Sequence, residues 1–331
     1  MCAEMSSPLP RRVAVTGASG FVGGHLVRRL RAHSVEVHAY GRRPAASVRA
    51  DVADVYESWD ITRAPLAAPP NVDAVVHCAG AVSDWGSRAF FEAGNVTGTR
   101  NVLATWPGAR IVHVSSASVY DPRHGKAVLE EADAPVHSVR EIERVRWMNE
   151  YGRTKRLAEH VVSTEAASWA ILRPHIVYGP CDTTVAPRLA GLVRRGTLLL
   201  PGDGRNVRAS VVHVDNLCHG IECALRTERS GVWNIVDAVA PTVHEATSSL
   251  FDALGMDVTI RYLPVMPVYA LSAVLERVWR LARARQAPRI TRYAVAHIAH
   301  DNVLSIERAR QELGYAPTLA WPESFETISL A

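Results

Sequence analysis

Two groups of side chains have the types and spacing needed for proton transfer. Tyr151 and Lys155 are four residues apart in a segment with a helical pattern, which places the phenol and the ammonium on one helix face. A neighbouring ammonium lowers the pKa of a phenol from about 10 and makes it a better acid or base near neutral pH. Such a pair is common on helices, so its meaning depends on Ser115 and Ser116, which end an apolar segment roughly 35 residues upstream.

Glycines recur at every third position near the start of the chain, at Gly17, Gly20 and Gly23. A β-branched run precedes them and an amphipathic helical pattern follows, which is the context that predicts a dinucleotide-binding loop. Gly17 permits a tight turn, Gly20 lets the backbone approach a pyrophosphate, and Gly23 lets the helix pack close to the strand. Free N–H groups at the helix N-terminus would bind the phosphates. The predicted cofactor-binding residues of the loop are Gly17, Ser19, Gly20, Phe21, Val22 and Gly23.

The second predicted strand, residues 35–40, ends in Gly41, Arg42 and Arg43. In nucleotide-binding folds of this type, an acidic residue at this place binds the ribose 2′-hydroxyl of NAD. Two arginines stand here instead, and a guanidinium suits a 2′-phosphate. The pattern favours NADP(H) over NAD(H), the alternative being that Arg42 and Arg43 are simply loop charges.

Further strands alternate with helices along the first half of the chain. A third strand ends near Asp60 and Ile61, a fourth over residues 72–80 ends in Ala79 and Gly80, and a fifth covers residues 109–120. Helices are expected over residues 90–106 and 140–162, and a sixth strand over 169–180. This alternation predicts an α/β fold, a Rossmann-type doubly wound parallel sheet whose ligands lie outside the carboxyl ends of the strands.

The pattern changes after Pro180. Residues 11–180 are expected to form the dinucleotide-binding core. Residues 181–331 are expected to form mainly a smaller C-terminal substrate-binding lobe, with some segments returning to the core. The last helix, residues 305–313, is followed by Gly314, which predicts a glycine C-cap.

The bulk composition narrows the classes of partner. The net charge of +4 arises mostly from scattered arginines, and the densest cluster, residues 277–285, is interpreted as a solvated helix face. No nucleic-acid motif is present. The five cysteines lack C-x-x-C spacing, so neither a disulfide framework nor a metal site is expected. Residues 1–12 lack the apolar core of a signal peptide, so a cytoplasmic location is expected.

The apolar segment 263–275 is too short to span a bilayer, so no transmembrane segment is expected. Three roles stay open for it: a lid helix packed on the core, a wall of a lipid pocket, or contact with a membrane surface.

Several motifs together resemble the extended short-chain dehydrogenase/reductases, over residues 11 to about 327. They are Thr16-Gly-Ala-Ser-Gly-Phe-Val-Gly23, Asp60-Ile61, Asn95-Val-Thr-Gly-Thr99, Ser115-Ser116, Tyr151-x-x-x-Lys155, Leu172-Arg-Pro-x-x-Val-Tyr-Gly-Pro180 and His213-Val-Asp-Asn216. The resemblance implies that Tyr151 donates or accepts the proton, that Lys155 lowers its pKa and holds the nicotinamide ribose, and that Ser116 binds the reacting oxygen. It also implies a structural role for Asn95 and cofactor contacts for Asp60, Ile61, Ala79, Gly80, Ser115, Pro174, His175 and Ile176.

Within this superfamily, sugar-nucleotide dehydratases carry Thr-Asp-Glu where this chain has Ser116, Ala117 and Ser118. The missing carboxylate argues against dehydration. Segments 173–182, 185–189, 202–206 and 313–317 are similar to the 3β-hydroxysteroid dehydrogenase branch and, within it, to bacterial 2-alkyl-3-oxoalkanoate reductases. The resemblance implies NADPH-dependent reduction of a 3-oxo group on a lipid-like small molecule. Asp84, Trp85, Ser118, His175 and Arg208 are the candidate substrate residues.

Two other functions stay open. A sugar-nucleotide epimerase typically places an arginine just before the strand at His213, and Arg208 lies near that place but one residue out of register. A non-catalytic NADP-binding regulatory protein is disfavoured because Ser116, Tyr151 and Lys155 are all present. The superfamily also implies a homodimer formed through the two helices that flank the active site.

Overall fold

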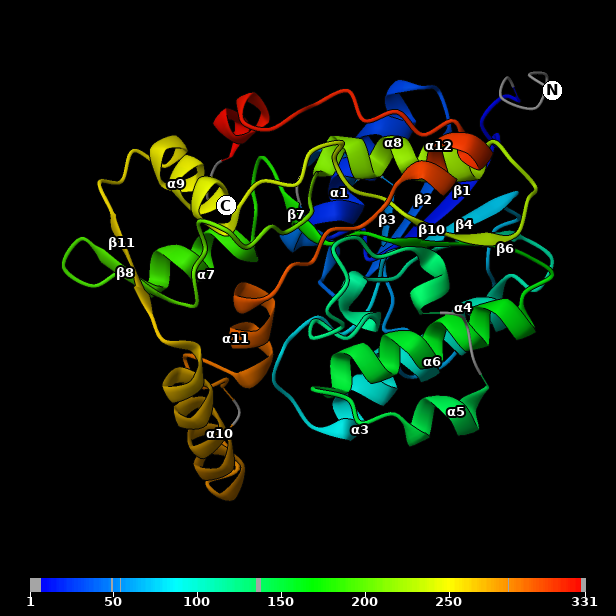
Figure 1. Cartoon of the computed structure of the whole chain (residues 1–331). Coiled ribbons are helices and arrows are strands. Elements are labelled where there is room, and N and C mark those ends of the chain that lie inside the picture. The colour runs from blue at the N-terminus through cyan, green and yellow to red at the C-terminus, as the bar shows by residue number, and fades with distance from the viewer. Residues whose placement is uncertain (1–6, 49, 54, 135–137, 285, 329–331) are drawn as a thin grey trace.

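The centre of the protein is a parallel sheet of seven strands in the order β10-β6-β5-β4-β1-β2-β3 (Figure 1). The computed structural model describes residues 7–48, 50–53, 55–134, 138–284 and 286–328. The strands are β1 (Arg12–Thr16), β2 (Glu36–Gly41), β3 (Tyr56–Ser58), β4 (Ala74–His77), β5 (Arg110–Val114), β6 (Ser168–Arg173) and β10 (Gly231–Asn234). From β1 the strands β2 and β3 are added on one side and the strands β4, β5 and β6 on the other, so the strand order reverses between β1 and β4; this is the switch point of a doubly wound sheet and confirms the predicted fold class.

Helices cover both faces of this sheet, so its inner strands are buried on both sides. On one face lie α1 (Phe21–Ala32), α8 (Val214–Leu225) and α12 (Glu307–Leu313). On the other lie α3 (Arg88–Phe91), α4 (Gly98–Thr105), α5 (Val139–Arg144) and α6 (Glu150–Glu165). A short helix, α2 (Ala50–Ala53), precedes β3. Each face has its own apolar core, with Leu26 and Leu217 in one and Val102 and Val161 in the other.

Three expected elements are interrupted in the structure. The helix expected over 90–106 changes to a π-helical segment at Glu92–Thr97 before α4 begins. The helix expected over 140–162 is divided into α5 and α6, and α6 begins where the Asn149 side chain accepts a hydrogen bond from the Gly152 N–H. The strand expected over 169–180 ends at Arg173, because Pro174 has no N–H to continue the ladder.

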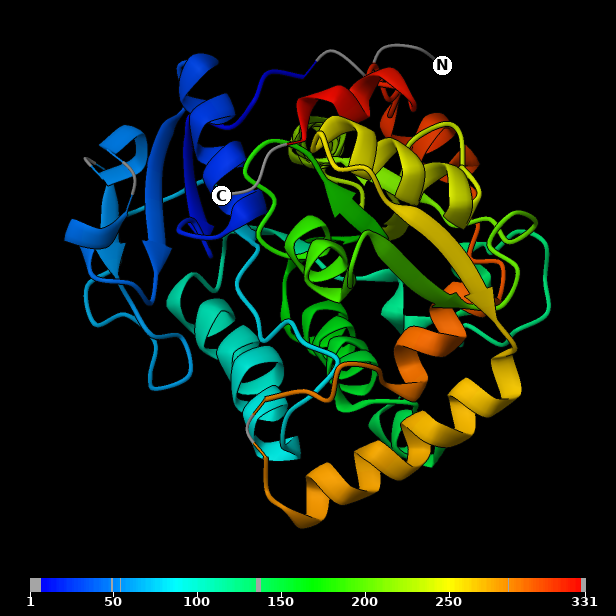
Figure 2. The same cartoon turned by 90° about the vertical axis from the view of Figure 1, so that its left-hand side faces the viewer.

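The remaining segments form two small parallel pairs beside the large sheet. β7 (Ile176–Tyr178) pairs with β9 (Val211–His213), and β8 (Thr197–Pro201) pairs with β11 (Thr259–Leu263), as Figure 2 shows for the second pair. Four helices accompany them: α7 (Val185–Leu192), α9 (Val243–Ala253), α10 (Val265–Leu281) and α11 (Arg292–Ala299). The chain returns to the large sheet through α8, β10 and α12. Gly314 has a φ of 68°, which confirms the predicted C-cap of α12.

Across the described residues, no helix is both long enough and apolar enough to cross a bilayer.

Candidate active site

The glycine turn joins β1 to α1 at the switch point of the sheet. Gly17 has a φ of +76°, and a Cβ there would lie 2.7 Å from the backbone nitrogen of Ala79. A Cβ on Gly23 would lie 2.3 Å from the Gly17 carbonyl oxygen, so only glycine allows α1 to begin this close to the strand. Gly20 precedes the helix without a side-chain cap, and the first turn of α1 carries no acidic residue. This geometry fits the binding of a dinucleotide pyrophosphate at the helix N-terminus.

The end of β2 lies against this glycine turn. A Cβ on Gly41 would lie 2.7 Å from Ser19 Oγ, so Arg42 follows immediately beside the loop. Arg42 and Asp60 line a surface pocket of about 420 Å³ together with Arg63, a residue that sequence reasoning missed. Burial raises the pKa of Asp60, but hydrogen bonds from Thr62 and the charges of Arg42 and Arg63 outweigh it and lower that pKa overall. Two cations therefore face one carboxylate here.

Tyr151 lies in the first turn of α6, beside the serines that follow β5. A Cβ on Gly152 would lie 2.4 Å from the Ser118 carbonyl oxygen, so this glycine lets α6 closely approach residues 115–118, called the serine segment below. The approach brings the Tyr151 phenol close enough to Ser116 for the serine hydroxyl to lower the pKa of the phenol. The structure therefore brings together two of the predicted catalytic residues at the carboxyl edge of the sheet.

Lys155 lies one helical turn beyond Tyr151 and is almost fully buried. Its Nζ donates a hydrogen bond of 2.7 Å to the carbonyl oxygen of Val114, at the end of β5. Burial lowers the pKa of Lys155 to about 8, although Glu159 and Cys78 favour the charged form. Burial also raises the pKa of Tyr151, and the Ser116 hydroxyl offsets only part of the rise. The expected lowering of the phenol pKa is therefore wrong for this structure, because burial outweighs the other influences.

Glu159 continues the line of Tyr151 and Lys155 along α6, and sequence reasoning missed it. Its carboxylate is fully buried and accepts hydrogen bonds of 2.9 and 2.7 Å from Arg173 and one of 2.6 Å from the Ser115 hydroxyl. Arg156 adds a contact of 3.2 Å. Burial raises the pKa of Glu159, but the two arginines lower it by more. The Ser115 side chain, predicted to contact the cofactor, thus donates its hydrogen bond to Glu159.

The loop after β4 is held by Asn95. Its side chain accepts a hydrogen bond of 2.7 Å from the Ala81 N–H and donates to the Ala81 carbonyl at 3.2 Å and to Thr154 at 3.0 Å. A Cβ on Gly80 would lie 2.8 Å from the Asn95 oxygen. These contacts fix the backbone at Ala79 and Gly80 beside the glycine turn, which agrees with a structural role for Asn95.

A second line of polar side chains reaches the serine segment from α11. The Ser116 hydroxyl donates a hydrogen bond of 3.0 Å to Ser118 Oγ, which lies 2.5 Å from the Tyr293 hydroxyl. The Tyr293 ring packs against His297 with centroids 4.1 Å apart, and His297 lies 5.7 Å from His175. Burial lowers the pKa of His297 to about 3 and that of His175 to about 4, so both rings are neutral. No sequence motif indicated Tyr293 or His297.

The other candidate substrate residues have different surroundings. Asp84 accepts hydrogen bonds from Arg188 and from Thr291, and the Trp85 indole donates to the Ala284 carbonyl at 3.1 Å. Both therefore connect the loop after β4 to the helices of the C-terminal half. Arg208 is exposed and donates to the Ala240 carbonyl. Within the described part of the chain, no contact joins Arg208 to the serine segment or to Tyr151.

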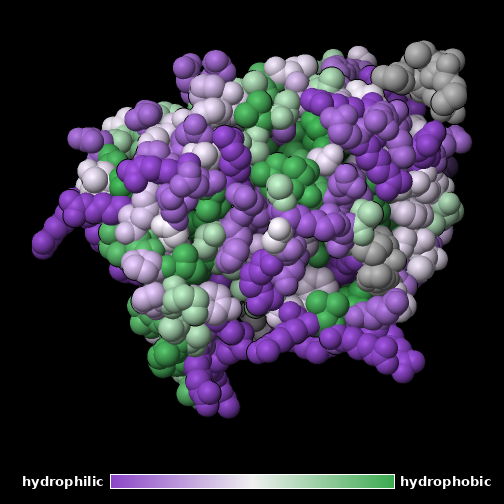
Figure 3. Space-filling model, in the orientation of Figure 1, coloured by the Kyte–Doolittle hydropathy of each residue, from purple (hydrophilic) through white to green (hydrophobic). Residues whose placement is uncertain are grey.

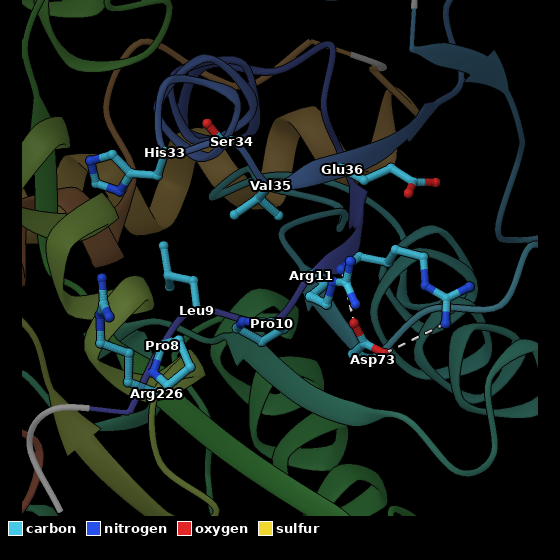
Figure 4. Close-up of a pocket in the computed structure, with 11 residues that line it drawn as sticks. Pro8, Leu9, Pro10, Arg11, His33, Ser34, Val35, Glu36, Asp73 and Arg226 are labelled. Atoms are coloured by element: carbon cyan, nitrogen blue, oxygen red, sulfur yellow. Dashed lines mark hydrogen bonds and ion pairs between the residues drawn. The ribbon is translucent and has the colours of Figure 1, made fainter.

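The opposite edge of the sheet holds a larger surface pocket of about 680 Å³ (Figure 4). It lies at the amino ends of β1 and β2, where Arg12 binds Asp73. None of the predicted site residues lines it. No cluster of His, Cys, Asp or Glu that could hold a metal ion is found among the described residues.

Comparisons with known proteins agree with this geometry. The chain is 29% identical to 2-alkyl-3-oxoalkanoate reductase of Stenotrophomonas maltophilia, covering 96% of this chain and 98% of that one. It is 27% identical to 4-hydroxy-2-methyl-3-oxo-4-farnesyl-3,4-dihydroquinoline-1-oxide ketoreductase of Stigmatella aurantiaca, covering 97% and 96%. Its fold is similar to that of UDP-glucuronic acid 4-epimerase from Bacillus cereus in complex with NAD, with a TM-score of 0.68 and 20% identity over 96% of this chain and 97% of that one.

A sequence profile matches residues 13–236, which is more than half of the chain. The protein therefore belongs to the NAD dependent epimerase/dehydratase family, the extended short-chain dehydrogenase/reductases that its motifs resemble.

Proposed function

We propose that the protein reduces a ketone on a lipid-like molecule to the hydroxyl compound, with NADPH as the reductant. The close approach of Tyr151 to Ser116 at the carboxyl edge of the sheet, beside the glycine turn, carries the proposal. The names of the two full-length relatives, a 2-alkyl-3-oxoalkanoate reductase and a ketoreductase, support this reaction.

NADPH supplies the hydride when it is bound, and the protein supplies position and the proton. Gly17, Gly20 and the N-terminus of α1 would hold the pyrophosphate. The Ser116 hydroxyl would bind the ketone oxygen, and the Tyr151 phenol would transfer its proton to that oxygen as it becomes a hydroxyl. Because burial raises the pKa of Tyr151, the phenol keeps its proton at neutral pH, as a donor for reduction requires.

The surroundings of Ser116 and Tyr151 favour a substrate with few charges. Phe91 lies with its ring centroid 6.3 Å from that of Tyr151, and Tyr293, His297 and His175 are neutral. A sugar-nucleotide epimerase would need a cation for the diphosphate. Arg208, the residue near the expected place, instead binds a surface carbonyl.

A panel of three ketone and sugar substrates tests this function. The loss of NADPH absorbance is measured with a 2-alkyl-3-oxo acid, a 3-ketosteroid and a UDP-sugar. We expect turnover with at least one lipid ketone and none with the UDP-sugar. If neither ketone causes NADPH oxidation, and the protein binds the UDP-sugar and retains NAD through purification, the epimerase function is favoured over the reductase function.

The preference for NADPH is expected to depend on Arg42 and Arg63, which line the same pocket. The double substitution R42A/R63A removes two cations that would bind the 2′-phosphate, and should lower the ratio of kcat/KM for NADPH to that for NADH by about 10- to 100-fold. The value for NADH should stay nearly constant. Arg43 does not line the pocket, so Arg43→Ala is the matched control. An unchanged ratio in R42A/R63A would remove the basis for NADP(H) preference.

The rate of reduction is expected to fall above about pH 8. Burial lowers the pKa of Lys155 to about 8, so its positive charge is present below that pH and is lost above it. The raised pKa of Tyr151 keeps the phenol protonated over the same range, so Lys155 is the group that titrates. The measurement is kcat/KM against pH for the wild type and for Lys155→Met. If the slower variant keeps the same falling limb, the limb belongs to another group.

A further inference from the structure

Helix α10 differs from an ordinary surface helix because its two buried side chains are polar while several of its large apolar side chains are exposed. Its buried positions are Ser272 and Glu276, and Glu276 accepts three hydrogen bonds from Arg292 at the start of α11. Its outward face is apolar. The exposed large hydrophobic side chains of this face, with their exposed fractions, are Met266 (74%), Leu271 (55%), Val274 (59%), Val278 (48%) and Leu281 (78%). A surface helix of a globular protein normally turns its apolar side chains toward the core and its polar ones toward solvent.

This face is the main apolar surface of the described chain. Together with Leu263, it holds six of the thirteen large hydrophobic side chains that are exposed. Figure 3 shows hydrophobic side chains gathered over α10 at the lower left of the molecule, where Figure 1 shows the helix projecting from the body. Contiguous exposed apolar surface of this kind marks a site of interaction.

Positive charge accompanies the apolar face. Arg277, Arg280 and Arg283 are exposed at the C-terminal end of α10, and Glu276, which is buried, is the one acidic residue between 263 and 284. Within the described chain, Arg277 and Arg283 have no ion pair, and Arg280 lies over the ring of Trp85 at 5.7 Å. Uncompensated arginines beside an apolar stripe complement a surface that is apolar inside and anionic outside, as an anionic bilayer is.

The dimensions of the face argue against a second copy of the chain as its occupant. A helix of 17 residues is about 25 Å long and about 10 Å wide, so one face offers about 250 Å². A standard protein interface buries about 800 Å² on each partner. Insertion of one helix face into the boundary between headgroups and acyl chains needs no such area.

We propose that the outward face of α10 lies in the surface of an anionic phospholipid bilayer. Glu276 of α10 accepts hydrogen bonds from Arg292, and the next residue is Tyr293. The Tyr293 hydroxyl lies 2.5 Å from Ser118 Oγ, beside the predicted catalytic residues. The loop at Trp85 also contacts the segment after α10. α10 and α11 thus connect the proposed membrane face to the segment beside the predicted catalytic residues, and, resting on the proposed function, the membrane would be the source of an amphiphilic ketone.

Sedimentation with vesicles tests the proposal on the full chain. The vesicles are pure phosphatidylcholine or an equimolar mixture of phosphatidylcholine and phosphatidylglycerol. We expect the wild type to bind the mixed vesicles, with binding that weakens as salt is added. The substitution V274E/L281E places two charges on the apolar face and should weaken binding by about tenfold or more. V128E/V239E adds the same charges at two positions elsewhere that are each 47% exposed, and should bind like the wild type.

A second variant keeps the test informative if V274E/L281E fails to fold. R277A/R283A leaves the apolar face intact and should weaken binding to the mixed vesicles by about tenfold, with little change on pure phosphatidylcholine. Absence of vesicle binding by the wild type, equal binding by V274E/L281E, or a dimer in solution that Val274→Glu abolishes would each overturn the proposal. Binding is measured without NADPH or ketone, so failure here and failure of the reductase activity are separate results.

Discussion

Tyr151→Phe is expected to lower ketone-dependent NADPH oxidation by about 10²- to 10⁴-fold, the usual contribution of a positioned general acid. The substitution removes the hydroxyl that lies near Ser116 and would supply the proton, and it keeps the ring that packs near Phe91. Stability should therefore change little. The measurement is kcat with the best ketone of the panel, together with the thermal unfolding midpoint and the Kd for NADPH.

Two other tyrosine-to-phenylalanine substitutions are compared with Tyr151→Phe, the first as a control and the second as a test of the neighbouring hydroxyl. Tyr262 on β11 binds His244 and has no contact with the serine segment, so Tyr262→Phe should leave kcat unchanged. Tyr293→Phe removes the hydroxyl next to Ser118 but leaves both Ser116 and Tyr151 in place, so a smaller loss of about tenfold is expected. Equal losses in Tyr151→Phe and Tyr293→Phe would show that Tyr151 is not the proton donor and that the whole hydroxyl chain acts as a unit.

The sequence was sufficient to predict the parts of this site that depend on local pattern. The spacing of the glycines in residues 13–30 determines the strand, turn and helix there, because Gly17 adopts a positive φ and Gly23 has no room for a Cβ. The alternation of strands and helices over most of the first half of the chain likewise leaves the doubly wound sheet as the main choice. Predicted boundaries failed where one side chain ends an element, as at Pro174 and Asn149.

The rest of the site depends on contacts between distant segments. Tyr293 lies 175 residues from Ser118, and nothing in its own segment shows that its hydroxyl will meet that serine. Glu159 could have been noticed as the next residue along the face of Tyr151 and Lys155, but its partner Arg173 comes from a strand. The direction of the Tyr151 pKa shift depends on burial, which spacing on a helix does not reveal.

The orientation of α10 illustrates a similar limit. The hydrophobic period predicts a helix with two unlike faces, but it does not say which face turns inward. The arginines of residues 277–285 were interpreted as part of a solvated face; Arg277, Arg280 and Arg283 are exposed as that requires, and Arg285 lies outside the described residues. The apolar side chains Val278 and Leu281 between them are exposed as well, since the bonds from Arg292 to Glu276 fix the side of the helix that carries Ser272 and Glu276 inward.

Arg173→Leu is expected to destabilise the protein by about 3–5 kcal/mol, because it leaves a buried carboxylate with one cation in place of two. Arg173 is fully buried and donates to both oxygens of Glu159, to the Tyr120 hydroxyl and to the Ala134 carbonyl. A leucine fills part of the space but satisfies none of these acceptors. The measurement is the free energy of unfolding in urea at pH 7. The control is Arg310→Leu, which breaks an exposed ion pair with Glu307 and should cost less than about 1 kcal/mol.

The pH dependence separates this loss from a simple packing defect. In the wild type the pKa of Glu159 is lowered, so its contribution to stability is present above the unfolded value of about 4.3 and is lost as the pH falls through the folded value. Without Arg173, burial is opposed by Arg156 alone and the pKa of Glu159 rises, so the carboxyl takes up a proton at a higher pH. The cost of Arg173→Leu should therefore be largest near neutral pH and smaller at pH 5. Adding Glu159→Gln to Arg173→Leu should recover part of the loss at pH 7, because it removes the under-compensated charge. A cost that is the same at both pH values and unaffected by Glu159→Gln would mean that Arg173 stabilises the fold through packing and not through the buried ion pair.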